Sequence, residues 1–347
     1  CINKTHKLIN HSIIYPCTYI IDPTLPNKIN NKIFPRTKIL KGLKEIPVNN
    51  ISSSVIHICT PPLHRIEIIK EALQRGFRKF IIEKPLATNK ADFEAIKKLF
   101  AIYNTEPFIV SNWSTSHLTD KLIEKINIYK HKSIHIDSIF ISHSKSRINR
   151  TLNSQSHQKA SQVELPHMLV LTFLILGNHY KVDFANEWDL LVGKEKIKKM
   201  GGIYVLLKMQ NNIPVHLCSD LMSPVKEKKI CIKFSDNSKI EGFFPADSTD
   251  FYSMLYEYNS LGTKINTEYF EDNTLLQFIS KAYECFLGKG DKLLSNLDFH
   301  SGICNVLDDI NQFSKKESNL TKNKNNHITE VNNSVWHSFI KDRAIKA

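Results

Sequence analysis

The sequence predicts an α/β protein in two parts: a parallel sheet flanked by helices, then an α+β part with a mostly antiparallel, open sheet. Two short, apolar, β-branched runs, Val55–Cys59 and Lys79–Ile82, indicate the first part, because such runs are typical of strands buried on both faces. About twenty residues separate them, which fits a crossover helix with its two loops. Later segments that alternate between apolar and polar residues, with turn residues between them, indicate the second part.

The length of 347 residues suits two domains. A chain of this size can bury a large enough core to be stable without disulfides or structural metal ions. We expect a first domain over 1–114, a second over 115–313, and a polar linker with a C-terminal helix over 314–347. The longest mostly apolar run, Met168–Leu176, is too short to cross a bilayer, and no signal-peptide pattern opens the chain. The seven cysteines are scattered without metal-ligand spacing, which favours reduced thiols in the cytoplasm.

The formal net charge of +13 raises nucleic acid as a partner. The lysines are spread along the chain and form no stripe. They accompany many Asn and Ile residues, which indicates a compositional bias rather than a phosphate-binding face. We therefore expect neither a nucleic acid nor a membrane as partner.

The helices of the first part follow from apolar spacing. Residues Arg65–Arg75 carry apolar side chains at helical intervals and are followed by Gly76, a natural helix stop. A second helix is predicted over Lys90–Phe100, with Asn89 as its cap. The next strand is predicted over Pro107–Val110.

Residues suited to a ligand follow the two defining strands. They are Thr60, Pro61, Pro62 and His64 after the first strand, and Glu83, Lys84 and Pro85 after the second. In open α/β sheets, ligands bind outside the carboxyl ends of the strands. The sequence therefore predicts a binding site at this edge.

The ordered pair Thr-Pro-Pro-x-His and Glu-Lys-Pro resembles the signature of the glucose–fructose oxidoreductase/inositol dehydrogenase (Gfo/Idh/MocA) family. The resemblance implies a nicotinamide-dependent oxidoreductase that transfers a hydride to or from a sugar, amino-sugar or cyclitol carbon. It implies that NAD or NADP lies at the two motifs and beside Asn112, and that Lys84 contacts both the cofactor and the substrate. It also implies a frequent cis bond before Pro85, and a homodimer or homotetramer formed through the open sheet. Asn112 has a second interpretation, as a structural turn residue.

The run Tyr15–Ile21 ends at Asp22 and fits the second strand of a dinucleotide-binding, Rossmann-type fold. The acid that ends this strand binds the adenosine ribose. Asp22 precedes a proline, so a plain turn is the alternative. An acid here favours NAD over NADP, although one of the basic residues between 27 and 41 could offset its charge.

The first strand and the Gly-rich phosphate loop of such a fold are missing from the sequence. Asn3 stands where the third glycine of the turn belongs, three residues before His6. We expect an N-terminally truncated fragment whose parallel sheet has a gap. The rival hypothesis is a chain that has lost its phosphate loop.

The second part begins with a helix over Ser116–Ile128 and a strand over Ile134–Ser142. A polar, irregular stretch, Lys145–Gln162, follows, and the resemblance implies that it folds over the active site. Glu164 and His167 come next, directly before an apolar helix at Met168–Leu176.

The resemblance implies that His167 acts on the substrate oxygen and that Glu164 contacts the substrate. Val163 stands where the family has an aspartate. A helix-capping or core histidine is the alternative for His167, and an exposed loop lysine is the alternative for Lys84. Arg147 and Arg150 are candidates for binding a phosphate or carboxylate on the substrate.

Further strands and helices complete the prediction. The strands are Ile203–Met209, Val215–Asp220, Lys229–Phe234 and Lys239–Phe244; the helices are Thr274–Leu287, Asp298–Phe313 and Ile328–Ile345, with an exposed linker at Ser314–His327. Hydride transfer needs donor and acceptor held close and a group that moves the hydroxyl proton. Lys84 and His167 are the candidates. The competing hypothesis is a non-catalytic relative that acts as a binding or scaffold protein.

Overall fold

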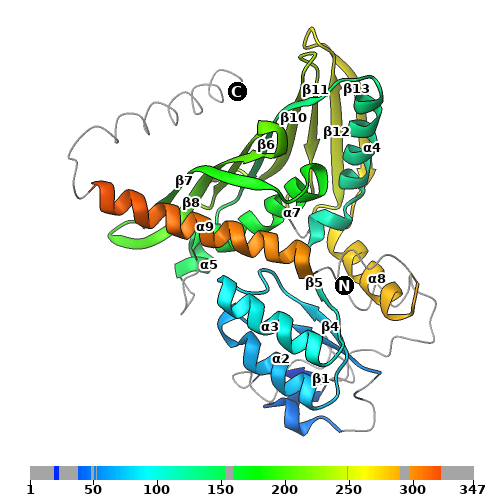
Figure 1. Cartoon of the computed structure of the whole chain (residues 1–347), viewed down its shortest axis with the longest axis vertical. Helices are drawn as coiled ribbons and strands as arrows, with labels where there is room; N and C mark the ends of the chain where they lie inside the picture. Colours follow the sequence, from blue (N-terminus) through cyan, green and yellow to red (C-terminus); the bar gives the residue numbers. More distant parts are fainter. Residues whose placement is uncertain are drawn as a thin grey trace.

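The computed structural model describes residues 19–22, 38–47, 51, 53–152, 159–247, 249–289 and 297–321, with side chains to residue 313. Short parallel strands lie in the first third of the chain, and a large, mostly antiparallel sheet occupies the remainder (Figure 1). The predicted fold class is confirmed. The sequence predictions for Asn3, for the start of the Tyr15 strand and for the helix at Ile328–Ile345 lie outside the described residues.

The parallel strands form two separate sheets within the described residues. β1 (Tyr19–Ile21) pairs with β2 (Lys38–Leu40), and β3 (Val55–Ile58), β4 (Lys79–Ile82) and β5 (Pro107–Ile109) form the other sheet in the order β3-β4-β5. The hypotheses of a truncated fragment and of a gap in the parallel sheet stay predictions.

Helices cover both faces of the β3-β4-β5 sheet. α2 (Arg65–Gln74) and α3 (Lys90–Ile102) bury Ile69, Leu73, Phe93 and Phe100 against one face. Their positions follow from the apolar spacing in the sequence and from the Asn89 side chain, which accepts a hydrogen bond from the Asp92 amide. Gly76 ends the first helix with a φ of 101°.

The opposite face of this sheet is covered by α8 (Thr274–Phe286), which comes from the far end of the chain. Phe278, Ile279 and Ala282 pack on Ile81 and Phe108. Because α8 follows the last strand of the large sheet, the two sheets are tied together by packing as well as by the chain.

The large sheet has the strand order β13-β12-β11-β10-β6-β9-β8-β7 in the described part of the chain. All neighbours are antiparallel except β6 and β9, which are parallel. The strands are β6 (Ile136–Ser144), β7 (Tyr180–Val192), β8 (Glu195–Met209), β9 (Pro214–Asp220), β10 (Glu227–Phe234), β11 (Lys239–Phe243), β12 (Tyr252–Tyr258) and β13 (Lys264–Glu271).

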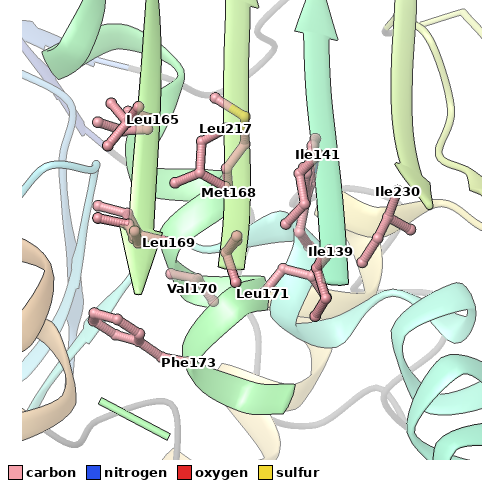
Figure 2. Close-up of a cluster of buried hydrophobic side chains, with 14 of the residues drawn as sticks. Ile139, Ile141, Leu165, Met168, Leu169, Val170, Leu171, Phe173, Leu217 and Ile230 are labelled. Atoms are coloured by element: carbon pink, nitrogen blue, oxygen red, sulfur yellow. The ribbon is translucent and has the colours of Figure 1, made fainter. Parts of the chain in front are cut away.

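One face of this sheet carries the main hydrophobic core. α7 (Leu165–Leu176) lies across it, and Met168, Leu169 and Leu171 are fully buried. Figure 2 shows these side chains directed at the strands, beside Ile139 and Leu217. The helix is apolar on all sides, as expected of one enclosed between a sheet and other helices. α4 (His117–His131) flanks β12 and β11.

The long helix α9 (Leu297–Thr321) runs between the two sheets (Figure 1). Its Asp308 carboxylate accepts a hydrogen bond from the Lys90 amide at 2.8 Å, and its Asp309 accepts one from the Tyr180 hydroxyl at 2.8 Å. Helix α9 therefore contacts α3 on one side and β7 on the other, and fixes the two parts against each other.

Several boundaries differ from the sequence predictions. Strands β7, β12 and β13 were not predicted, and the polar stretch predicted to be irregular contains two short helices, α5 (Ile148–Leu152) and α6 (Ala160–Val163). α9 continues to Thr321, past the predicted start of the linker at Ser314. The division into domains at 114/115 stays a prediction. No helix in the described ranges is long and apolar enough to cross a membrane.

Asp272 should be a major contributor to stability, because its fully buried carboxylate satisfies several groups at the start of α4. It accepts hydrogen bonds from Ser116 Oγ at 2.5 Å, from Ser253 Oγ at 2.7 Å and from the His117 and Leu118 amides. We expect Asp272→Ala to lower the free energy of unfolding by about 2 to 4 kcal/mol, measured by urea titration.

The matched control is Asp298→Ala. Asp298 is mostly exposed and pairs with Lys97, so its loss should leave the urea midpoint nearly unchanged. Equal effects from the two substitutions would contradict the account.

His57 should make stability depend on pH. It lies on β3 with Nε2 3.1 Å from the Tyr283 hydroxyl on α8, and burial lowers its pKa from 6.5 to about 4. Below pH 6.5, His57 binds a proton in the unfolded chain but not in the folded protein. The free energy of unfolding therefore falls as pH falls towards 4. Between pH 7 and pH 5, wild type should lose about 2 kcal/mol more than His57→Gln.

Urea titrations at both pH values measure this difference, with His135→Gln as the control. The His135 side chain is exposed, so this variant should follow wild type. A His57→Gln variant that keeps the full pH dependence of wild type would refute this role.

Candidate active site

The candidate site forms where the parallel strands end. β3, β4 and β5 are parallel neighbours, so the residues after them emerge at one edge of the sheet. Thr60 follows β3, the segment Glu83–Pro85 follows β4, and Asn112 follows β5 in a short 3₁₀ helix, η4 (Asn112–Thr115). The Lys84–Pro85 peptide bond is cis, as the resemblance implies.

Lys84 reaches from this edge to the start of α7. Its ammonium donates a hydrogen bond to the Val163 carbonyl. Burial lowers the pKa of Lys84, and the nearby carboxylates of Glu164 and Glu83 act in the opposite direction. Lys84 is therefore not an exposed loop lysine.

Glu164 is the central carboxylate of the site, directly before α7 and only 4% exposed. Arg147 Nη1 lies 3.0 Å from its Oε1, and His143 Nδ1 lies 3.1 Å from its Oε2. Burial acts to raise the pKa of Glu164, but His143 and Lys84 hold it well below its usual value. The carboxylate is therefore charged.

His167 lies in the first turn of α7, two residues after its start at Leu165. Its ring stacks on Trp113 at 6.0 Å between centroids, and Trp113 stacks on Phe244 at 4.4 Å. Burial lowers the pKa of His167 well below its usual value, and the positive charge of Lys84 adds to this effect. His167 is neutral, and its Nδ1 has no hydrogen-bond partner among the described residues.

Lys84 and His167 line one small, partly open pocket. Ser111 and Val110 line it from the end of β5, and His300 and Cys304 line it from α9. The pocket thus combines two candidate proton-transfer groups with a largely apolar wall.

Three buried oxygen atoms at the strand ends have no hydrogen-bond partner in the described part of the chain. They are Thr60 Oγ1, Ser111 Oγ and Asn112 Oδ1. Buried polar groups normally have partners, so these three atoms are free to hydrogen-bond a ligand at this edge.

The structure brings together some of the predicted residues and leaves others apart. Lys84, Glu164, His167 and Arg147 form one electrostatic cluster, and Arg150 is exposed but close enough to lower the pKa of Lys84. The remaining strand-end residues lie at the same edge: Thr60, Pro61, Pro62, His64, Glu83, Pro85 and Asn112. Asp22 directly follows β1, on the separate two-stranded sheet.

His143 and Lys228 were missed by the sequence prediction. They are paired residues on the neighbouring strands β6 and β10. Burial lowers the pKa of both, while the charge of Glu164 acts to raise it. Each lies in an ordinary alternating strand, so only the pairing of β6 with β10 reveals that they belong to the site. Within the described ranges, no three His, Cys, Asp or Glu side chains are grouped as a metal site.

No protein-family model and no curated protein matches this sequence. Solved structures do match it. KijD10, a 3-ketoreductase from Actinomadura kijaniata solved with NADP and TDP-benzene, is 13% identical with a TM-score of 0.63, covering 81% of this chain and 83% of its own.

Two further solved structures have the same fold as this chain. The protein yvaA from Bacillus subtilis is 16% identical with a TM-score of 0.65, covering 87% of this chain and 90% of its own. The UDP-N-acetylglucosamine 3-dehydrogenase GnnA from Acidithiobacillus ferrooxidans is 11% identical with a TM-score of 0.59, covering 80% and 83%. With its parallel strands, its open antiparallel sheet and these matches, the chain has the fold of the Gfo/Idh/MocA-type oxidoreductases.

Proposed function

We propose that this protein is a nicotinamide-dependent oxidoreductase that transfers a hydride to or from a sugar, amino-sugar or cyclitol carbon. One observation carries the proposal: Lys84 and His167 line a single pocket at the strand ends, beside the charged carboxylate of Glu164. Structures with the same fold include a 3-ketoreductase and a sugar-nucleotide dehydrogenase, which supports this reaction class.

The residues at the strand ends fit a nicotinamide dinucleotide. Thr60 Oγ1, Ser111 Oγ and Asn112 Oδ1 are unpaired among the described residues, and a carboxamide or ribose hydroxyl can pair with them. Pro61, Pro62, His64, Glu83 and Pro85 would border the cofactor, and Asp22 would bind the adenosine ribose. When bound, the cofactor supplies or accepts the hydride.

Lys84 and His167 would manage the proton that accompanies hydride transfer. The lowered pKa of Lys84 brings its amine closer to equilibrium with the ammonium at neutral pH, which suits a group that both donates and accepts. Neutral His167 has an unpaired Nδ1 that can accept or donate one hydrogen bond to the substrate oxygen. The negative charge of Glu164 favours the protonated form of both.

The cations around Glu164 favour a substrate with an anionic group. Arg150 lies near enough to lower the pKa of Lys84, and Lys228 near enough to Glu164 for that carboxylate to act on its pKa, so a phosphate or carboxylate on the sugar would meet positive charge here. KijD10 was solved with a nucleotide-linked ligand and NADP. NAD stays our preference on the strength of Asp22, with NADP as the alternative.

We also propose that the protein forms a homodimer or homotetramer through the large sheet. Tyr252, Ile265 and Tyr269 are exposed on its strands β12 and β13, with 59 to 64% of their surface accessible. Exposed aromatic and branched side chains on a sheet face are typical of subunit contacts.

A non-catalytic binding protein is the second candidate, and one observation favours it. Val163 replaces the aspartate expected before His167, and its carbonyl holds the Lys84 ammonium. In that case the pocket would bind a ligand without turnover.

Lys84→Ala tests the proposed function. If Lys84 moves the proton, turnover of nucleotide-linked sugars with NADH or NADPH should fall by roughly two to four orders of magnitude in the full-length protein. Lys90→Ala, on the exposed start of α3, is the control and should keep wild-type turnover. Unchanged turnover in Lys84→Ala, with the same melting temperature, would remove Lys84 from the mechanism.

A further inference from the structure

Arg65 is the largest fully buried side chain of the part that carries the parallel strands, with 2% of its surface exposed. It is the first residue of α2 and directly follows the Thr60–His64 turn. A charged side chain this buried is normally paired with a carboxylate. The Glu83 carboxylate acts on Arg65 through its charge, but the hydrogen bonds of Arg65 go to main-chain carbonyls.

These carbonyls belong to the two strand ends of the candidate site. Nε and Nη2 donate to the Thr60 carbonyl at 3.0 and 2.8 Å. Nη1 donates to the carbonyls of Glu83 and Pro85. Arg65 therefore holds the carbonyl on each side of Lys84 and ties both to the end of the neighbouring strand.

The geometry is more specific than filling a core position requires. An apolar side chain could occupy the space without the cost of burying a charge, which lowers the pKa of Arg65 to about 10. Only a planar, multiply donating group can satisfy three converging carbonyls at once. The group that this arrangement immobilises is the backbone of Lys84.

We propose that Arg65 is a positioning residue that holds the Lys84 backbone so that its ammonium stays within the cluster at the start of α7. A role of this placement in catalysis rests on the proposed function. The placement itself is a property of the folded chain and can be measured without turnover.

The charged and titratable groups that face Lys84 set its pKa, which is the quantity to be measured. They are Glu83 beside it, Glu164 and His167 at the start of α7, Arg147 and Arg150 from the polar stretch, and His143 from β6. If Arg65 is removed, the loop loses its anchor and Lys84 gains water. Its pKa should then rise towards the usual value.

Competitive acetylation with acetic anhydride, followed by mass spectrometry across pH 6 to 11, measures the pKa and reactivity of each lysine. We expect Arg65→Met to raise the apparent pKa of Lys84 by about one unit or more and to increase its labelling several-fold. Lys125 on α4 is the internal reference, because it pairs with Glu257 and Glu268 and none of the groups that face Lys84 acts on its pKa. Its profile should not change.

Arg75→Met is the matched control. Arg75 caps the other end of α2 and donates to the Ile46 carbonyl at 2.6 Å, far along the helix from Lys84. Its loss should leave the Lys84 profile at its wild-type position even if stability falls. A purely structural role for Arg65 predicts that both variants behave alike.

Arg65→Lys distinguishes the effect of the hydrogen bonds to the carbonyls from the effect of the positive charge. It also replaces Arg65→Met as the test variant if Arg65→Met does not fold. It keeps the positive charge but cannot hold three carbonyls, so the Lys84 profile should shift in the same direction by a smaller amount. An unchanged Lys84 profile in the folded Arg65 variants would overturn the proposal. A shifted profile in a protein without any turnover would retain the positioning role and refute only the proposed function.

Discussion

The burial of one lysine ammonium is the constraint on which the rest of the site depends. Taking the Lys84 charge out of water is costly unless partners compensate for it, and here the compensation comes from the Val163 carbonyl and the charge of Glu164. Glu164 is itself buried and needs Arg147 and His143. Each group is thus stabilised by the next, and the whole cluster exists only if two distant parts of the chain meet.

Helix packing makes that meeting possible. The strand-end loops come from the parallel sheet, whereas Glu164 and His167 come from the start of α7 on the large sheet. α8 packs on the parallel sheet from one side, and α9 contacts both α3 and β7. These two helices come from the C-terminal third of the chain, so segments far along the chain from Lys84 and His167 hold the candidate site together.

The sequence predicts the chemical groups better than their surroundings. Lys84 and Asn112 could be placed together because parallel strands end at one edge, and a polar segment before a strongly apolar helix marked His167. His143 and Lys228 could not be found, since the pairing of β6 with β10 joins strands about ninety residues apart and has no local signal. Arg65 lies in a helix pattern where an arginine normally faces water, and β7 was missed because its residues are mostly half-buried on both faces.

The central claim is that a reduced nicotinamide binds at the pocket lined by Lys84 and by His167, whose ring stacks on Trp113. Titrating the full-length protein with NADH and then with NADPH, while exciting tryptophan, measures this most directly. The account predicts saturable quenching of protein emission with energy transfer to the nicotinamide, and a clear loss of that transfer in Trp113→Phe. No quenching by either nucleotide up to millimolar concentration would contradict the account and would favour a binding protein for another ligand.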